Sequence, residues 1–254
     1  IRRRLAPLLE NNRRKIELMN MLLLSLPGTP VVYYGDELEM GDNYYLGDRD
    51  GVRTPMQWSP DRNAGFSKAN PHRLYLPVII DSEYHFAAVN VENQQKNASS
   101  LLWWMKRIIT IRKQYKAFGR GDIRFLLPEN PRVLVFTRTY EEQTLLIVAN
   151  LSRFCQIVHL DLREYEGWTP VEVFSSNPFS RITRQPYPLT LGPHSFFWFV
   201  LEKAEEPVEL TEPEKRMELQ CRGSWKNLSS GAQRRNLEEV LFRYLSQRRW
   251  FGGK

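Results

Sequence analysis

The stretch that most constrains the fold of this chain is GTPVVYYGDELEMG, at residues 28–41. Its first half, residues 29–34, is short, β-branched and aromatic. This half is apolar on both faces, as a parallel strand covered by helices should be. The second half begins an acidic turn that contains Asp36, Glu37, Glu39 and Asp42. Parallel α/β folds place their chemistry at the carboxyl ends of strands, so the pattern predicts a buried strand that delivers carboxylates to an open face.

The segments on either side predict half of a βα repeat and then a long loop. Apolar residues in the segment 11–26 have the one-face spacing of a helix that ends at Pro27-Gly28; they are Ile16, Met19, Leu23 and Leu26. Residues 41–92 are rich in Gly, Asp, Asn, Pro and aromatic residues and lack periodicity. Loops of that length are uncommon unless they are functional. On a barrel, this loop is expected to lie over the active face.

Helical spacing returns over residues 99–115, with Ser99 or Ser100 as the N-cap. Trp103 and Trp104 follow in this helix. We expect their rings to pack against a neighbouring sheet rather than to form a sugar platform, because adjacent helical positions point about 100° apart.

Seven β-type runs follow the second helix and predict an antiparallel sandwich. They recur at roughly ten-residue intervals, separated by turns rich in Pro, Gly, Asn and Glu. The runs are residues 123–127, 133–140, 144–151, 156–162, 171–174, 188–191 and 196–201. Trp168 and Trp198 are expected in the core of this sandwich, since no cluster of aromatic residues in the runs indicates a carbohydrate site.

The charge of the chain is concentrated near its C-terminus. The net charge is +7, and residues 215–254 hold ten Lys/Arg against three Asp/Glu, so the preceding residues are balanced. We therefore expect neither a nucleic-acid surface nor a membrane surface in the main body. No apolar run approaches the roughly 20 residues that span a bilayer. Residues 204–228 are expected to be a linker, and residues 229–245 an amphipathic helix.

The two cysteines and the chain ends indicate the expected compartment and the expected extent of the chain. Cys155 and Cys221 form neither a disulfide framework nor a zinc pattern, so a reducing cytoplasm is expected. Gly252-Gly253-Lys254 lacks the spacing of a phosphate loop. The chain lacks an initiator Met and stops without a closing element, which we interpret as an internal fragment cut at both ends.

Two groups of charged residues are candidates for chemistry: the acidic turn and the alternating run at residues 48–53, DRDGVR. Ordinary turn capping and surface ion pairs would also explain them. In a functional interpretation, carboxylates accept hydroxyl hydrogens, and an arginine clamps an oxygen or orients a carboxylate. Both properties suit a sugar site, and the candidate substrate-binding residues are Asp36, Glu37, Asp50 and Arg53.

At these residues the chain resembles the alpha-amylase superfamily, glycoside hydrolase family 13. Residues 28–37 resemble its eighth-strand motif. Residues 50–58 and 61–67 are similar to a loop of its oligo-1,6-glucosidase, sucrose-acting and trehalose synthase members. Residues 40–43, 45–53, 94–95 and 99–102 fit the trehalose synthase subgroup, which converts maltose to trehalose.

The resemblance implies a fold class of α/β plus all-β. Residues 1–116 correspond to the end of a (β/α)8 catalytic barrel, and residues 117–203 to the β-sandwich appended to it. Residues 229–254 are similar to the N-terminal cap of maltokinase, which in some bacteria is fused behind trehalose synthase, and would begin a further α/β domain.

The resemblance also implies what this chain does and lacks. The catalytic Asp nucleophile, Glu acid/base and second Asp come from earlier barrel strands, so no catalytic residue is expected here and the isolated chain is expected to be inactive. The full-length enzyme is expected to interconvert maltose and trehalose through a covalent glucosyl-enzyme intermediate. A hydrolytic α-glucosidase and a non-catalytic carbohydrate-binding segment are the alternatives.

Expected ligands and partners follow from the same resemblance. Maltose and trehalose are the expected small molecules, with no nucleic acid and no membrane, and a homo-oligomer remains open. No cofactor or metal site is expected within these residues. Calcium is an option for the full-length enzyme, and ATP with magnesium only where a complete kinase domain follows.

Overall fold

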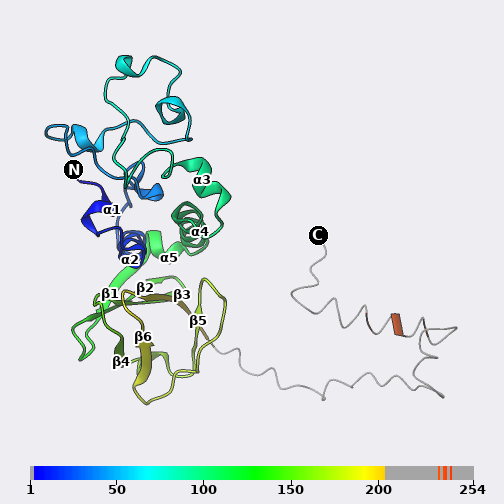
Figure 1. Cartoon of the computed structure of the whole chain (residues 1–254). Coiled ribbons are helices and arrows are strands. Elements are labelled where there is room, and N and C mark those ends of the chain that lie inside the picture. The colour runs from blue at the N-terminus through cyan, green and yellow to red at the C-terminus, as the bar shows by residue number, and fades with distance from the viewer. Residues whose placement is uncertain (1–2, 204–233, 235–236, 239–240, 242–254) are drawn as a thin grey trace. The chain divides into compact units, whose positions relative to one another are not determined.

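Figure 1 shows the computed structural model, which describes residues 3–203 and, beyond them, residues 234, 237–238 and 241. Within residues 3–203, a region of long irregular loops, a group of helices and two β-sheets follow one another (Figure 1). Residues 234, 237–238 and 241 are helical. The predicted linker, and the predicted maltokinase-like cap apart from these four positions, lie outside the described residues.

The helices of residues 3–203 are α1 (Leu5–Leu8), α2 (Arg13–Ser25), α3 (Val91–Lys96), α4 (Leu101–Gln114) and α5 (Lys116–Arg120). Side-chain oxygens cap three of them: Asn12, Asn90 and Ser100 accept a hydrogen bond from the backbone three residues on. Each cap satisfies an amide that the first helical turn leaves without a partner. The two predicted long helices are therefore confirmed, as is Ser100 as an N-cap.

The predicted buried face of α2 is wrong in part. Ile16 is buried as expected, but Met19 and Leu23 are exposed, while Leu18, Met21 and Leu24 are buried. The helix is apolar around most of its circumference, so spacing alone could not choose its inner face. Packing against α4 and the sheet made that choice, because these neighbours meet the side that carries Leu18 and Met21.

The strand predicted at residues 29–34 is not formed. These residues have no regular secondary structure, and Val31 and Val32 are exposed. A strand exists only through hydrogen bonds with a neighbouring strand. Within residues 3–203, the named strands pair only with one another in the two sheets, and none pairs with residues 29–34.

The seven predicted strands are all present. They are β1 (Asp122–Leu126), β2 (Val133–Tyr140), β3 (Gln143–Asn150), β4 (Gln156–Leu160), β5 (Thr169–Glu172), β6 (Tyr187–Leu191) and β7 (Phe196–Glu202). Five form a sheet in the order β1-β2-β3-β7-β5, and β4 pairs with β6. Every pairing is antiparallel, which confirms the predicted sandwich.

The five-stranded sheet is covered on both sides. One core joins residues of α2, α4 and α5 to one face of β2, β3 and β7, and a second core joins the opposite face to β4 and β6. Strand β3 is therefore buried along nearly its whole length, whereas β4 and β6 alternate between buried and exposed residues. These packed layers attach the helices of the barrel part firmly to the sandwich.

The predicted positions of three tryptophans are confirmed. Trp198 is fully buried, and Trp168 packs against the core between the sheets. Trp104 meets Phe196 edge-on, with ring centroids 6.4 Å apart. Trp103 differs, because it is exposed and its Nε1 donates to Gln95 O at 3.0 Å.

The long loop is irregular, as predicted, but hydrogen bonds of two side-chain amides hold it in place. It contains three short 3-10 turns, η2 (Asp50–Val52), η3 (Arg62–Gly65) and η4 (Pro71–Arg73). The buried Gln57 side chain donates to Val89 O. Gln94 donates to Leu38 O and accepts from Leu102 N, both at 3.0 Å. The Gln94 amide thus links the residues on either side of the loop, and the Gln57 amide links the middle of the loop to its end.

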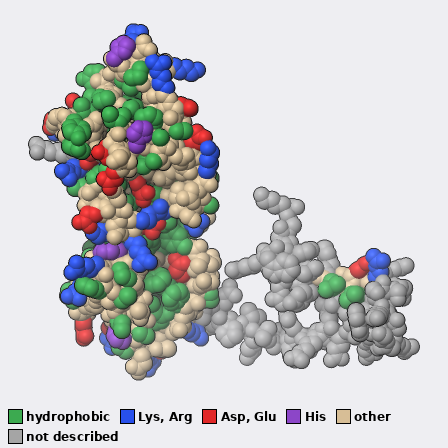
Figure 2. Space-filling view, in the orientation of Figure 1, with side chains coloured by type: hydrophobic (Ala, Val, Ile, Leu, Met, Phe, Trp, Pro, Cys, Tyr) green, Lys and Arg blue, Asp and Glu red, His purple; other side chains and the backbone are tan. Residues whose placement is uncertain are grey.

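Within residues 3–203 and the few described residues beyond, no helix is both long and apolar enough to cross a membrane. Figure 2 shows Lys and Arg interspersed with Asp and Glu over the visible face of residues 3–203.

Candidate functional site

One backbone carbonyl, that of Val52, links three distant parts of the chain. Tyr33 donates to it from its hydroxyl at 3.1 Å, Tyr34 at 3.3 Å and Arg4 from Nη2 at 2.9 Å. Arg4 also donates to the carbonyl oxygen of Tyr34, and its guanidinium carbon lies 4.7 Å from the centroid of the Tyr34 ring. The buried Arg4 side chain therefore fixes the turn that presents residues 50–54 beside the segment 33–37.

The acidic turn is held by its own backbone and by the segment that precedes α1. The 3-10 turn η1 (Asp36–Leu38) begins after Gly35, whose φ of 88° is left-handed, where glycine is least strained. Glu37 Oε2 accepts from Gly35 N at 2.7 Å. Asp36 accepts from Leu5 N at 3.3 Å, and Asp42 accepts from Arg4 N at 2.9 Å.

Burial disfavours the charged forms of three acids in this turn. It raises the pKa of Asp36 and Asp42 above the ordinary value of 3.8, although Arg4 opposes the shift. Burial likewise raises the pKa of Glu39, against the attraction of Arg13. These carboxylates are therefore part of the structural packing of the turn.

The shifted pKa of Asp36 makes the effect of its replacement depend on pH. The pKa of Asp36 is higher in the folded protein than in the unfolded chain. As pH rises from about 4, Asp36 therefore ionises first in the unfolded chain, which stabilises the unfolded state and lowers the free energy of unfolding of the wild type. Asn keeps an oxygen for Leu5 N but does not ionise. We expect the free energy of unfolding of Asp36→Asn, relative to wild type, to increase from about pH 4 to about pH 7. Urea unfolding at each pH measures it, and a flat or declining difference would contradict the burial argument.

A cavity of about 530 Å³ lies between the acidic turn and the long loop. This volume is that of an ordinary small-molecule pocket. Its lining residues are Tyr34, Glu37, Arg53, Thr54, Pro55, Met56, Trp58, Phe66, Leu74, Tyr75 and Leu76. The cavity thus combines one carboxylate, one guanidinium and four aromatic rings.

Of the four predicted substrate-binding residues, two line the cavity and two do not. Glu37 and Arg53 both line the cavity. Asp50 lies next to it, with its Oδ1 3.4 Å from Arg53 Nη1. Asp36 does not line the cavity, and its carboxylate is directed to the backbone of Leu5.

Sequence reasoning missed Arg4 and the aromatic wall of the cavity. Arg4 was part of a basic run at the start of the chain, with no pattern to separate it from its neighbours. Trp58, Phe66 and Tyr75 lie in the loop without periodicity. The signal that could have found them is the density of aromatic residues in a long polar loop.

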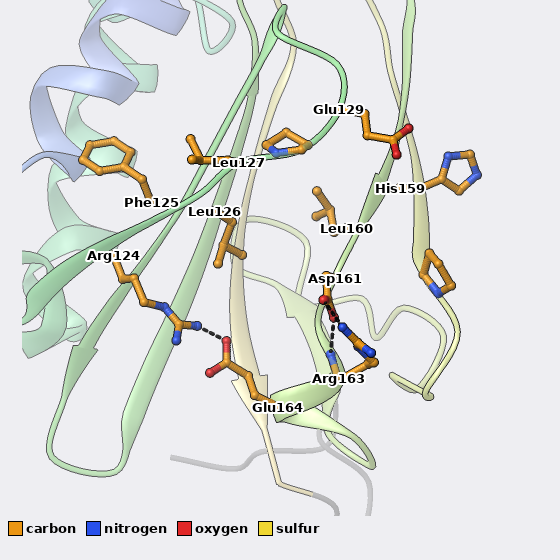
Figure 3. A pocket seen from close by; sticks show the side chains of 12 residues that line it. Arg124, Phe125, Leu126, Leu127, Glu129, His159, Leu160, Asp161, Arg163 and Glu164 are labelled. Carbon is orange, nitrogen blue, oxygen red and sulfur yellow. Dashed lines mark hydrogen bonds and ion pairs between the residues drawn. The ribbon is translucent and has the colours of Figure 1, made fainter.

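A larger hollow, of about 1220 Å³, lies on the sandwich (Figure 3). Two ion pairs join four of its charged side chains: Arg124 donates to Glu164, and Arg163 donates to Asp161 at 2.6 Å. The hydrogen bonds from Arg163 lower the pKa of Asp161 to about 2. None of the predicted site residues lines this hollow, so the smaller cavity is the better candidate for a sugar site.

Among the described residues, no group of three or more His, Cys, Asp or Glu side chains is placed to hold a metal ion. The close carboxylates of the acidic turn are instead occupied by backbone amides.

Comparison with known proteins agrees with the two parts of the fold. Residues 2–121 match the family described as alpha amylase, catalytic domain. Residues 123–198 match the maltogenic amylase C-terminal domain. The chain belongs to the alpha-amylase superfamily. With the antiparallel sheets, these matches confirm the predicted fold class of a barrel portion followed by a β-sandwich.

Relatives within the superfamily include trehalose synthases. The chain is 56% identical over 205 residues to trehalose synthase of Pimelobacter sp., covering 79% of this chain and 36% of that protein. It is 51% identical over 215 residues to trehalose synthase of Thermus thermophilus, covering 84% of this chain and 22% of that protein. The chain thus spans about a third or less of these relatives.

Among solved structures, the chain resembles the trehalulose synthase of Pseudomonas mesoacidophila with a TM-score of 0.59 at 21% identity. The match covers 76% of this chain and 40% of that chain. At this identity the likeness concerns the fold of the alpha-amylase superfamily alone.

Proposed function

We propose that this chain forms one wall of the active site of an enzyme that interconverts maltose and trehalose by intramolecular glucosyl transfer. The observation that carries the proposal is that Glu37 and Arg53 line one cavity together with aromatic rings. The identity of more than half to a trehalose synthase over 79% of the chain supports the substrate class. Aromatic faces and a few converging polar groups are what a sugar site requires.

In the proposed reaction, a carboxylate contributed by residues outside this chain attacks the anomeric carbon of maltose. The glycosidic bond breaks, the departing glucose takes a proton from a carboxylic acid, and a glucosyl ester forms. The glucose then turns, and its anomeric hydroxyl attacks the anomeric carbon of the enzyme-bound glucosyl unit while the acid's conjugate base removes the proton. The ester bond breaks and trehalose forms, without a net gain or loss of atoms.

The residues of this chain bind and orient rather than react. The Arg53 guanidinium can donate to sugar hydroxyl oxygens or hold a reacting carboxylate in place, and Glu37 can accept from a hydroxyl. Rearrangement exceeds hydrolysis only where water is excluded while glucose stays bound. Residues 42–90 are proposed as part of the lid that excludes it.

Arg53→Ala in the full-length enzyme should lower kcat/KM for maltose isomerisation about 10- to 100-fold. This range follows from the roughly 1.5–3 kcal/mol of a hydrogen bond to a charged group. Initial rates of trehalose formation measure the effect. Arg49→Ala is the matched control, because Arg49 is an exposed arginine at the start of the same turn and does not line the cavity. An unchanged kcat/KM in Arg53→Ala would remove Arg53 from the site.

Incubation of the full-length protein with maltose tests the function itself. Trehalose as the main product supports the proposal, whereas glucose alone identifies a hydrolytic α-glucosidase. The isolated chain should bind sugar at most, so turnover of maltose by these 254 residues alone would contradict the proposal that the catalytic carboxylates lie elsewhere.

We further propose that residues 229–254 begin a maltokinase-like domain, which would bring ATP and magnesium to the full-length protein. The length of the Thermus thermophilus relative is consistent with an additional domain, since 84% of this chain covers only 22% of that protein. Calcium for the full-length enzyme, a cytoplasmic location and a homo-oligomer remain proposals. Chelator treatment of the full-length protein, with its thermal stability as the readout, tests the first of these.

A further inference from the structure

Three aromatic side chains on the cavity wall are unusually exposed for their size. Trp58 is 50% exposed, Phe66 is 52% exposed and Tyr75 is 97% exposed. Leaving such rings in water forgoes stabilisation of about 25 cal/mol for each Å² of apolar surface. All three line the cavity that also holds Glu37 and Arg53, so the exposed apolar surface coincides with converging polar groups.

The Trp58 ring stands on a rigid support. Its backbone N donates to Ala64 O at 2.8 Å, and its carbonyl accepts from Glu92 N at 3.1 Å. The adjacent Gln57 is buried and bonded through its side chain. Trp58 is therefore fixed by backbone bonds that do not depend on its own ring, and the ring can be changed without removing its support.

The turn that supports Trp58 is also strained. Asn63 and Ala64 have left-handed backbone angles, with φ of 56° and 58°. The left-handed region costs a residue with a Cβ about 1–2 kcal/mol. Strain of this kind is retained where surrounding structure holds it, often beside a ligand site. Here it closes the turn from Trp58 to Phe66, which brings two of the exposed rings to one cavity.

The chemistry of the wall fits a hexopyranose. A pyranose ring presents C–H groups on its faces and hydroxyls around its edge, so a flat aromatic face can cover the former while charged groups bond the latter. Stacking of this kind does not demand one orientation of the hydroxyls, whereas a fixed hydrogen-bond network does. An aromatic wall can hold a sugar and still allow it to turn.

We propose that Trp58, together with Tyr75 on the wall of the same cavity, is the platform that retains the glucose released from maltose while that glucose turns. This inference rests on the proposed function and adds a specificity-determining role within it. Trp58 sets the partition of the glucosyl ester between the retained glucose, which gives trehalose, and water, which gives free glucose. The proposed role concerns this partition and not the formation of the ester itself.

The test uses the full-length enzyme and its Trp58→Ala and Trp58→Phe variants. With maltose, we expect the ratio of trehalose to free glucose to fall about tenfold in Trp58→Ala and to recover largely in Trp58→Phe. Hydrolysis of α-glucosyl fluoride, which releases no second sugar, is measured alongside, and we expect it to fall less than the ratio of trehalose to glucose, since loss of fluoride does not use the platform. Trp103→Ala is the matched control, because Trp103 is an exposed tryptophan that does not line the cavity.

Tyr75→Ala provides a second test in case Trp58→Ala does not fold. Tyr75 is almost fully exposed, so its truncation removes little packing, and we expect a fall in the same ratio of about threefold. A wild type that forms trehalose, with an unchanged ratio in Trp58→Ala or in Tyr75→Ala, would overturn the inference and leave the proposed function standing. A wild type that forms no trehalose from maltose would overturn both.

Discussion

Arg138→Met is expected to lower the free energy of unfolding by about 2–4 kcal/mol. Arg138 lies on β2 and is buried; its Nη1 donates to Ser25 O at 2.6 Å and its Nη2 to Gly121 O at 2.8 Å. Ser25 is the last residue of α2, where carbonyl groups have no partner within the helix. Methionine keeps the apolar stem but leaves both carbonyls unsatisfied.

Arg112 shares this role and shows why the effect should be large. Its Nε donates to Leu24 O at 2.8 Å, so two arginines from other elements bond the final carbonyls of α2 and oppose its negative end. Burial lowers the pKa of Arg138, and the nearby charge of Arg112 lowers it further. The cost of burying Arg138 offsets part of its contribution, which is the reason for an upper limit of about 4 kcal/mol.

Urea unfolding followed by circular dichroism measures the change in Arg138→Met. Arg132→Ala is the matched control, because Arg132 is an exposed arginine just before β2 and should change the free energy of unfolding by less than about 0.5 kcal/mol. If Arg138→Met were as stable as the control, the carbonyl groups at the end of α2 would have to be hydrogen-bonded without Arg138.

Arg4→Met is expected to cost a similar amount, about 2–4 kcal/mol, and to loosen the candidate site. Arg4 is buried and donates from its side chain to the carbonyls of Tyr34 and Val52. Its guanidinium also lies over the rings of Tyr33 and Tyr34. Without it, the turn that holds Arg53 loses its link to the acidic turn.

The local effect of Arg4→Met separates it from a general loss of stability. Hydrogen exchange of the backbone amides of residues 42–56 should become faster by about 10-fold or more, a ratio that corresponds to roughly 1.4 kcal/mol of local opening. Amides of β3, which lies in the sandwich, should follow the global change alone. Arg3→Ala is the control, since Arg3 is an exposed neighbour in sequence. Equal exchange in the two variants would contradict the assigned role of Arg4.

Local patterns predicted the sandwich well because its β-type runs recur at roughly ten-residue intervals and are separated by turn residues. The helix over residues 99–115 was equally accessible, since Ser100 caps it and its apolar residues recur at helical spacing. The segment 29–34 shows the limit of such reasoning: its residues favour a strand, but the hydrogen bonds of a strand must come from another segment. The prediction of the buried face of α2 was wrong in part for a related reason. The apolar residues of this helix form more than one face that could be buried.

The candidate site shows the same division. Glu37 and Arg53 were identified by residue type within two charged runs, and the structure brings both to one cavity. Asp36 is an acidic residue of the same run, yet it does not line the cavity, and its carboxylate accepts a hydrogen bond from Leu5 N. Nothing in the spacing of neighbouring acids states which one turns towards a cavity and which one satisfies a backbone amide.

The sequence by itself determined the two long helices, the antiparallel sandwich, the long irregular loop and the resemblance to the alpha-amylase superfamily. These follow from periodicity, turn residues and short motifs, which are local properties of the chain. Only the tertiary structure decided that Arg4 and Arg138 bond carbonyls at least 17 residues away and that Trp58, Phe66 and Tyr75 share a cavity with Glu37 and Arg53. Such contacts depend on how separate elements pack, and the residues that make them carry no local signal of their partners.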